Sequence, residues 1–83
     1  MYYIYVLQSK LDLKLYIGLT KNLSQRIKKH NSGDVKSTSK RRPFILVYYE
    51  CLANKKDAYA REKYLKSGYG HEQLYNIFKN TLQ

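Results

Sequence analysis

The stretch LYIGLTKNLSQRIKKH, residues 15–30, contains the strand-to-helix transition on which the predicted fold depends. Its first part alternates apolar side chains with Tyr16 and Gly18, and this period of two predicts a β-strand over residues 14–19. The run YYIYVLQ, residues 2–8, alternates in the same way and predicts a second strand. Because a short polar turn separates them, the two strands are expected to form a hairpin.

The alternation also assigns side chains to the two faces of the hairpin. Four apolar side chains are expected to face the core: Ile4, Val6, Ile17 and Leu19. Tyr5 and Tyr16 then share the opposite face. Gly18 lies in mid-strand without a side chain to pack, which indicates either close approach by a ligand or another backbone, or a β-bulge.

The second part of the stretch predicts a helix with an identifiable start and stop. Asn22 is followed three residues later by Gln25, a capping-box-like pair in which the Asn side chain can accept a backbone N–H. The helix is expected to run to about Asn31, with Gly33 as its stop. Residues 32–43, SGDVKSTSKRRP, then predict a polar and basic loop without regular structure.

The rest of the chain predicts one more strand and two helices. Residues 44–52 are a nearly continuous apolar run, typical of a well-covered strand. Asn54 caps a second helix over residues 55–67, which SGYG ends, and a third helix covers residues 71–80. The order β-β-α-β-α-α predicts a single α+β domain over residues 1–83, with a three-stranded antiparallel β-sheet flanked by helices.

Sixteen Lys and Arg residues against six Asp and Glu residues give the chain a net charge of +10. Residues 21–42 concentrate this charge, with eight basic residues and one acid. Such a balance indicates a polyanionic partner, nucleic acid before anionic membrane, although a solubilising surface is the simpler alternative. The ten tyrosines favour nucleic acid, since tyrosine can stack on bases or hydrogen-bond phosphates.

Other classes of site are disfavoured by what the sequence lacks. Cys51 is the single cysteine, so it has neither an internal disulfide partner nor a CxxC metal motif. His30 and His71 lack a zinc-like spacing, and there is no phosphate-binding P-loop. No apolar run is long enough to span a bilayer and the start lacks a signal-peptide layout, so we expect a cytoplasmic protein.

Two polar residues lie on the edge of the expected inward stripe of the first helix. Arg26 and His30 are one turn apart, beside the apolar Leu23 and Ile27. One explanation is that Arg26 extends to water and His30 acts as a cap near the helix end. The other is that the helix presents them as a functional pair.

The second helix has an expected inward stripe that includes a carboxylate. The apolar members of this stripe are Ala58, Leu65 and Tyr69. Glu62 falls on the same stripe, where a carboxylate is costly unless it is paired or binds a metal. An ion pair, for instance with Arg61 or Arg26, is one explanation, and coordination of a divalent metal is the other.

Together these features resemble the GIY-YIG nuclease family, in the small stand-alone form related to the catalytic domain of the bacterial excision-repair incision subunit. The two half-motifs stand here as Tyr3-Ile4-Tyr5 and Tyr16-Ile17-Gly18. The family's threonine, leucine, arginine and histidine follow as Thr20, Leu23, Arg26 and His30, before Asn31-Ser32-Gly33. The sequence AREKYLKSG matches the family's Arg-Glu helix and supplies Glu62. The resemblance covers nearly the whole chain.

The resemblance implies a role for each of five residues. Tyr16, together with Tyr5, would organise or deprotonate the attacking water. Arg26 would stabilise charge on the scissile phosphate, and His30 would assist proton transfer or phosphate positioning. Glu62 would hold one divalent ion, Mg²⁺ or Mn²⁺.

The chain departs from the family pattern at three places. Tyr3 replaces the first glycine of the name motif, and Leu19 stands where some relatives carry a lysine, for which Lys21 is the candidate substitute. Asn76 is the nearest counterpart of a late phosphate-contacting asparagine. The residues expected to bind nucleic acid are Gly18, Lys21, Lys28, Lys29, Lys40, Arg41, Arg42 and Asn76.

The sequence therefore predicts a metal-dependent DNA endonuclease that acts on branched, nicked or single-stranded structures in DNA repair or recombination. RNA is the alternative substrate, and without a second domain to read bases we expect selection by structure rather than by sequence. No small-molecule cofactor and no membrane contact are expected, and no protein partner is identified. A non-catalytic nucleic-acid-binding module of the same fold is the main alternative, and an adaptor for an acidic protein is a third.

Overall fold

The N-terminal hairpin forms two strands of a three-stranded antiparallel sheet. The structure, a computed structural model, describes residues 1–81, so the last two residues of the predicted domain lie outside it. The central strand is β1 (Tyr2–Ser9), which pairs with β2 (Leu15–Thr20) on one side and β3 (Phe44–Leu52) on the other. The helices are α1 (Leu23–Ser32), the 3₁₀ helix η1 (Lys36–Arg41), α2 (Lys55–Lys66) and α3 (Gly68–Ile77). The predicted α+β class and element order are confirmed, with η1 added.

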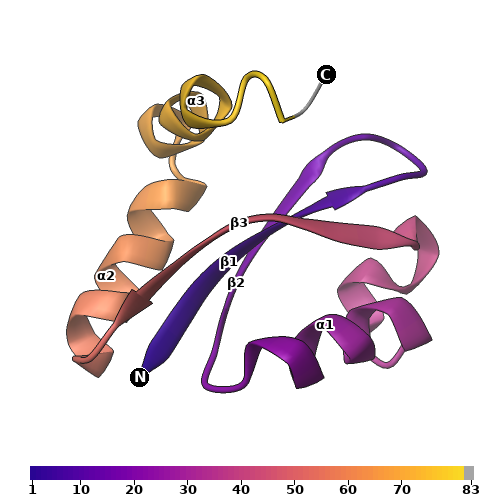
Figure 1. The fold of residues 1–83 in the computed structure, drawn as a ribbon, viewed down its shortest axis with the longest axis horizontal. Coiled ribbons are helices and arrows are strands. Elements are labelled where there is room, and N and C mark those ends of the chain that lie inside the picture. Colours follow the sequence, from indigo (N-terminus) through magenta and orange to yellow (C-terminus); the bar gives the residue numbers. More distant parts are fainter. Residues whose placement is uncertain (82–83) are drawn as a thin grey trace.

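Helices cover both faces of this sheet, with α2 and α3 at the left and top of Figure 1 and α1 at the lower right. Beneath α2 and α3 lies the main apolar core of Ile4, Val6, Leu15, Ile17, Ala58, Leu65, Leu74 and Phe78. On the other face, α1 packs over a smaller buried cluster of Tyr5, Leu7 and Phe44. The predicted division of the hairpin is confirmed, because Tyr5 and Tyr16 lie together on the face opposite the main core.

The ends of α1 follow from two residues outside it. The Asn22 side chain accepts a hydrogen bond from the backbone N–H of Gln25 at 3.1 Å, which satisfies one of the donors that a helix start leaves free. Gly33 has φ of 88° and its N–H bonds back to carbonyls of the last turn. A residue with a side chain is strained in that left-handed conformation, so the predicted stop at Gly33 is confirmed.

The third strand is less covered than its apolar run predicts. Because β1 occupies the centre of the sheet, β3 lies at an edge, and its residues Ile45, Leu46 and Tyr49 are 41%, 37% and 52% exposed. A β-bulge leaves Val47 unpaired between Tyr48 and Leu46, and the extra residue places Leu46 and Tyr49 on the same face. The expectation of a well-covered strand was therefore wrong.

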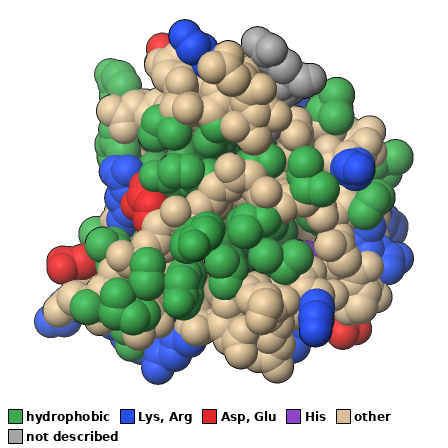
Figure 2. Space-filling model, viewed as in Figure 1, with side chains coloured by type: hydrophobic (Ala, Val, Ile, Leu, Met, Phe, Trp, Pro, Cys, Tyr) green, Lys and Arg blue, Asp and Glu red, His purple; other side chains and the backbone are tan. Residues whose placement is uncertain are grey.

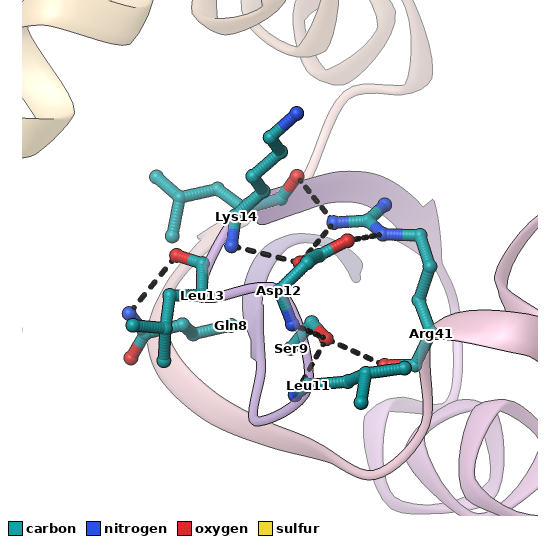
Figure 3. Close-up of polar contacts among 8 residues, drawn as sticks. Gln8, Ser9, Leu11, Asp12, Leu13, Lys14 and Arg41 are labelled. Carbon is teal, nitrogen blue, oxygen red and sulfur yellow. Dashed lines mark hydrogen bonds and ion pairs between the residues drawn. The ribbon is translucent and has the colours of Figure 1, made fainter.

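The basic segment at residues 32–43 is folded, contrary to the prediction of an irregular loop. Within η1, the Thr38 side chain is fully buried. The end of η1 is fastened to the β1–β2 turn (Figure 3): Ser9 Oγ donates to the carbonyl of Arg41 at 2.6 Å, and Arg41 Nε lies 2.7 Å from Asp12 Oδ2. The hydrogen bond from Arg41, with a second one from the Lys14 backbone N–H, lowers the pKa of Asp12 to about 2.

The sequence SGYG does not separate the last two helices by a loop. Ser67 ends α2 with its N–H on the carbonyl of Tyr64 and begins α3 by accepting from the N–H of Gly70. The predicted start of the third helix at residue 71 was therefore three residues late. Tyr69, expected on the inward stripe, is 81% exposed because it lies in α3 rather than α2.

Gly70 allows α3 to begin directly against the end of α2. A Cβ at this position would collide with the carbonyl oxygen of Tyr64 and lie 2.6 Å from the Cα of Leu65. Both contacts are with backbone atoms, which cannot turn aside as a flexible side chain can. Among residues 1–81, no helix is long and apolar enough to cross a membrane.

We expect Gly70→Ala to lower the free energy of unfolding by about 1–3 kcal/mol, because the added methyl group would push α3 away from α2. Gly68→Ala is the matched control, since a Cβ there meets nothing within 4 Å. That change is expected to be neutral or stabilising by up to about 1 kcal/mol. Urea denaturation of both variants and the parent measures the difference, and equal stability of the two variants would contradict the tight contact.

Candidate active site

Tyr5 and Gly18 face each other across the central pair of strands, and the Tyr5 ring lies over Gly18. A Cβ on Gly18 would collide with the phenol end of that ring, including Cε1 at 2.8 Å. The pairing of β1 with β2 is regular at this point, and the β-bulge lies on the β3 side instead. The sequence indicated that a ligand or another backbone approaches Gly18, or that Gly18 lies in a β-bulge. The structure instead fills the space above Gly18 with the ring of Tyr5.

The buried hydroxyl of Tyr5 is hydrogen-bonded to two side chains of α1. Tyr5 Oη lies 2.8 Å from His30 Nε2, and Arg26 Nε donates to the same oxygen at 3.3 Å. His30 is fully buried, so it is not an exposed cap, and the half-buried Arg26 is bonded to Tyr5 through Nε rather than extended freely to water. The helix edge instead presents both residues to one phenol.

Thr38 contacts the other ring nitrogen of His30. Its hydroxyl lies 2.8 Å from His30 Nδ1 and 3.3 Å from the Val35 carbonyl oxygen. If the single hydrogen of this hydroxyl goes to the Val35 carbonyl, Thr38 accepts from Nδ1–H, so we expect the Nδ1–H tautomer of the imidazole. In that tautomer His30 Nε2 accepts the hydrogen of Tyr5, and Tyr5 keeps lone pairs for Arg26.

This cluster is neutral at pH 7 except for Arg26. Burial raises the pKa of Tyr5, and the hydrogen bond from Arg26 only partly opposes it. Burial, together with the Arg26 charge, lowers the pKa of His30 from 6.5. The bond to Tyr5 occupies Nε of Arg26, so its two terminal nitrogens remain available for a planar two-point contact with phosphate oxygens.

Tyr16 is the more accessible of the two tyrosines. Its ring lies edge-on to His30 with centroids 4.9 Å apart, and 6.3 Å from the ring of Tyr5. Tyr5 is 1% exposed, whereas Tyr16 is half-buried, and its hydroxyl makes no hydrogen bond within residues 1–81. Of the pair, Tyr16 is the side chain that solvent can reach.

Glu62 does not form either of the ion pairs considered from the sequence. Arg61 bonds to Glu50 instead, with two contacts of 2.8 Å, and the carboxylate of Glu50 also accepts from Tyr48 at 2.7 Å. Glu62 lies 3.2 Å from Lys66, one turn along α2, and its side chain is 17% exposed. Its charge contributes to the raised pKa of Tyr5, so the carboxylate and the phenol are electrostatic neighbours.

The donor set near Glu62 fits one hard cation completed by substrate and water. No group of three or more His, Cys, Asp and Glu side chains gathers within residues 1–81. Mg²⁺ commonly uses one or two protein carboxylates and keeps waters or substrate phosphates as its other ligands. Glu62 meets that requirement, because its only ion-pair partner in this part of the chain is the half-exposed Lys66.

A cleft of about 220 Å³ lies between the end of β2 and the first half of α2. Lys21, Lys55 and Tyr59 are among its lining residues, and Tyr59 and Lys55 lie one and two turns before Glu62 on α2. Lys55 and Tyr59 were not predicted as site residues, although their helical spacing to Glu62 was visible. Thr38 was also missed, because a single hydroxyl in a basic segment carries no periodicity.

Apart from Gly18 and Lys21, which are described above, the predicted nucleic-acid-binding residues divide into three groups. Lys28, Lys29, Lys40 and Arg42 are exposed on α1 and around η1. Arg41 is held by Asp12 and lies over the Phe44 ring at 5.5 Å. Asn76 is exposed on α3, across the sheet from α1, so the structure does not bring it to the Tyr5 cluster.

We expect the free energy of unfolding to fall when the pH is lowered from about 7.5 to about 5.5. The native pKa of His30 is depressed, so the unfolded chain binds the proton first, and stability present above 6.5 is lost below it. One proton accounts for at most about 1.4 kcal/mol per pH unit. Urea denaturation at several pH values should show this slope in the parent and in His71→Gln, but not in His30→Gln.

We expect Thr38→Val to lower the free energy of unfolding by about 1–3 kcal/mol, because it leaves the buried Nδ1–H of His30 without an acceptor. Thr38→Ser keeps the hydroxyl and is expected to stay closer to the parent. Nitrogen NMR of the imidazole should report the Nδ1–H tautomer in the parent and in Thr38→Ser. An Nε2–H tautomer in the parent would contradict the assigned order of donors.

Comparisons with known proteins identify the family of the chain. Residues 1–76 match the family model of the GIY-YIG catalytic domain. The chain is 42% identical to a UPF0213 protein of Clostridium perfringens, over 100% of this chain and 89% of the relative, and 43% identical to one of Pediococcus acidilactici, over 95% and 83%. The solution NMR structure of a UPF0213 protein from Bacillus halodurans is 38% identical, with a TM-score of 0.58 over 94% of this chain and 86% of that one. By its fold, its half-motifs and these matches, the chain belongs to the GIY-YIG nuclease family.

Proposed function

We propose that this protein is a metal-dependent endonuclease that hydrolyses phosphodiester bonds in DNA. The observation that carries the proposal is the meeting of Tyr5, His30 and Arg26 in one hydrogen-bonded cluster, within electrostatic range of Glu62. Membership of a nuclease family supports the reaction class. The charge of +10 supports a polyanionic substrate.

Arg26 is suited to the negative charge that develops on the scissile phosphate. Its guanidinium is fixed by the bond from Nε to Tyr5, so the terminal nitrogens are oriented before substrate arrives. Groups oriented in advance need no reorganisation during reaction, which makes them effective in stabilising a transition state. Replacing the guanidinium by a flexible ammonium would lose both the fork and its fixed direction.

The two tyrosines have different proposed roles. Tyr5 is buried and already hydrogen-bonded to His30, so its contribution is to position Arg26. Tyr16 is accessible, and we assign it the contact with the attacking water. Its hydroxyl can both donate and accept a hydrogen bond, so Tyr16 is suited to orient that water.

Glu62 would hold the divalent ion, Mg²⁺ or Mn²⁺. When bound, such an ion polarises a non-bridging phosphate oxygen and stabilises charge on the leaving group. The half-exposed Lys66 gives Glu62 a flexible counter-ion along the same helix, and exposed pairs of this kind contribute little to stability. The carboxylate is therefore open to exchange one cation for another.

Substrate selection is proposed to depend on structure. Exposed cations on α1 and around η1 would contact the phosphate backbone, which carries no sequence information and weakens with salt. Branched, nicked and single-stranded DNA are the proposed targets, and DNA repair and recombination are the processes that produce them. RNA is the alternative substrate.

We expect purified parent protein to cleave at least one of labelled duplex, single-stranded, flap or branched DNA in Mg²⁺ or Mn²⁺. Glu62→Gln is expected to reduce the single-turnover rate by about 100-fold or more, because it removes the anionic oxygen donor, and to leave DNA affinity within about twofold. Glu72→Gln, an exposed carboxylate on α3, is the matched control and should cleave like the parent.

Two results would contradict the proposal. Tight binding by the parent with no cleavage of any substrate in either metal would support a binding module instead. Equal residual cleavage by the parent and Glu62→Gln would assign the activity to a contaminating nuclease.

A further inference from the structure

A groove of about 490 Å³ lies between the first half of α1 and the exposed edge of the sheet. We call it the α1/β3 groove; its main lining residues are Tyr3, Lys21, Leu23, Ile27, Leu46 and Tyr49. Figure 2 shows hydrophobic side chains gathered over the middle of the face that β3 crosses. The bulge at Val47 helps to form this groove, because it brings Leu46 to the same face as Tyr49.

The chemistry of the α1/β3 groove suits a flat aromatic group joined to an anion. The rings of Tyr3 and Tyr49 have centroids 6.0 Å apart, tilted by 56°, and Tyr49 is 52% exposed. Leu46 adds an apolar contact that is 37% exposed. Lys21 lines the groove, with its ammonium 5.2 Å from the centroid of the Tyr2 ring, and no carboxylate among residues 1–81 lines it. Charge and shape together favour a nucleotide over a second copy of this chain, which would bring its own charge of +10.

The groove adjoins the candidate active site. Tyr3 precedes Tyr5 by two residues and points to the same face of β1, and Ile27 directly follows Arg26 on α1. Lys21 lines this groove and also the cleft between the end of β2 and α2. A strand whose phosphate lies at Arg26 can therefore place a neighbouring base in the groove.

Only an unpaired base can use such a site. Within a duplex, both faces of a base are covered by stacked neighbours, so no face is free for a tyrosine ring. Tyrosine stacking tolerates any base, so the groove would select an unpaired base rather than a particular sequence.

We propose that the α1/β3 groove binds an unpaired base of the substrate, so that the substrate carries a single-stranded segment beside the bond to be cut. This inference rests on the proposed function for its position relative to cleavage. Its binding component is independent of cleavage, because it concerns affinity for single strands and can be measured without metal.

The test is fluorescence anisotropy in EDTA, which prevents metal-dependent cleavage, with labelled oligothymidylate and a blunt-ended duplex of equal phosphate number. Tyr49→Ala is expected to weaken binding of the single strand by about 5- to 100-fold and leave binding of the duplex unchanged. Tyr49→Phe keeps the ring and should bind like the parent. Tyr75→Ala, a 44% exposed tyrosine on α3, is the matched control and should also bind like the parent.

Thermal unfolding checks that each variant is folded, and Leu46→Ala provides a second change in the groove that should weaken single-strand binding alone. Unchanged single-strand affinity in Tyr49→Ala, or equal loss for both probes, would overturn the proposal. A dimer in the parent that Tyr49→Ala dissociates, with single-strand affinity unaltered, would also overturn it and assign the groove to a second copy. If Tyr49→Ala selectively loses single-strand affinity in EDTA, and the parent cleaves no DNA in Mg²⁺ or Mn²⁺, the base-binding groove is supported and the proposed endonuclease is contradicted.

Discussion

The contact of the Tyr5 ring with Gly18 is the constraint on which the candidate site depends. The absent side chain at Gly18 lets the phenol lie flat across β2 and carry its hydroxyl to α1. The Tyr5 hydroxyl contacts His30, and His30 in turn contacts Thr38. Thr38 is buried within η1, and Arg41 attaches the end of η1 to the hairpin turn. The geometry of the site is thus maintained by the sheet, α1 and η1 together.

Arg26 is the charged member of the buried cluster that it forms with Tyr5 and His30. Tyr5 and His30 are neutral at pH 7, and Arg26 enters with a single hydrogen bond from Nε. Two carboxylates near α2 show the contrast between a structural and an exchangeable charge. Glu50 is held by two bonds from Arg61 and one from Tyr48, and the bond from Arg61 lowers its pKa. Glu62 has only Lys66, a partner that is 53% exposed and can move to water.

The local sequence pattern predicted the helices and strands well. The features that it did not predict depend on contacts between residues far apart in the sequence. Period two and period 3.6 located the hairpin and α1, while Asn22 and Gly33 defined the ends of α1 because capping is a contact between near neighbours. The partners of Glu62 could not be predicted, since Glu50 competes for Arg61 from a strand eleven residues away in sequence. Gly18 was recognised as unusual, but a hairpin register is needed to see that Tyr5 fills its place. The edge position of β3 is likewise a property of strand order, which an apolar run does not encode.

The double role of Ser67 has a consequence for how chain length can vary. One residue ends α2 and begins α3, and Gly70 then fits against the last turn of α2, so the junction contains no spacer. An insertion there would separate the two caps and rotate α3 relative to α2, which would withdraw Leu74 and Phe78 from the main core. The chain is therefore expected to tolerate an inserted residue better in its other connections than at this junction.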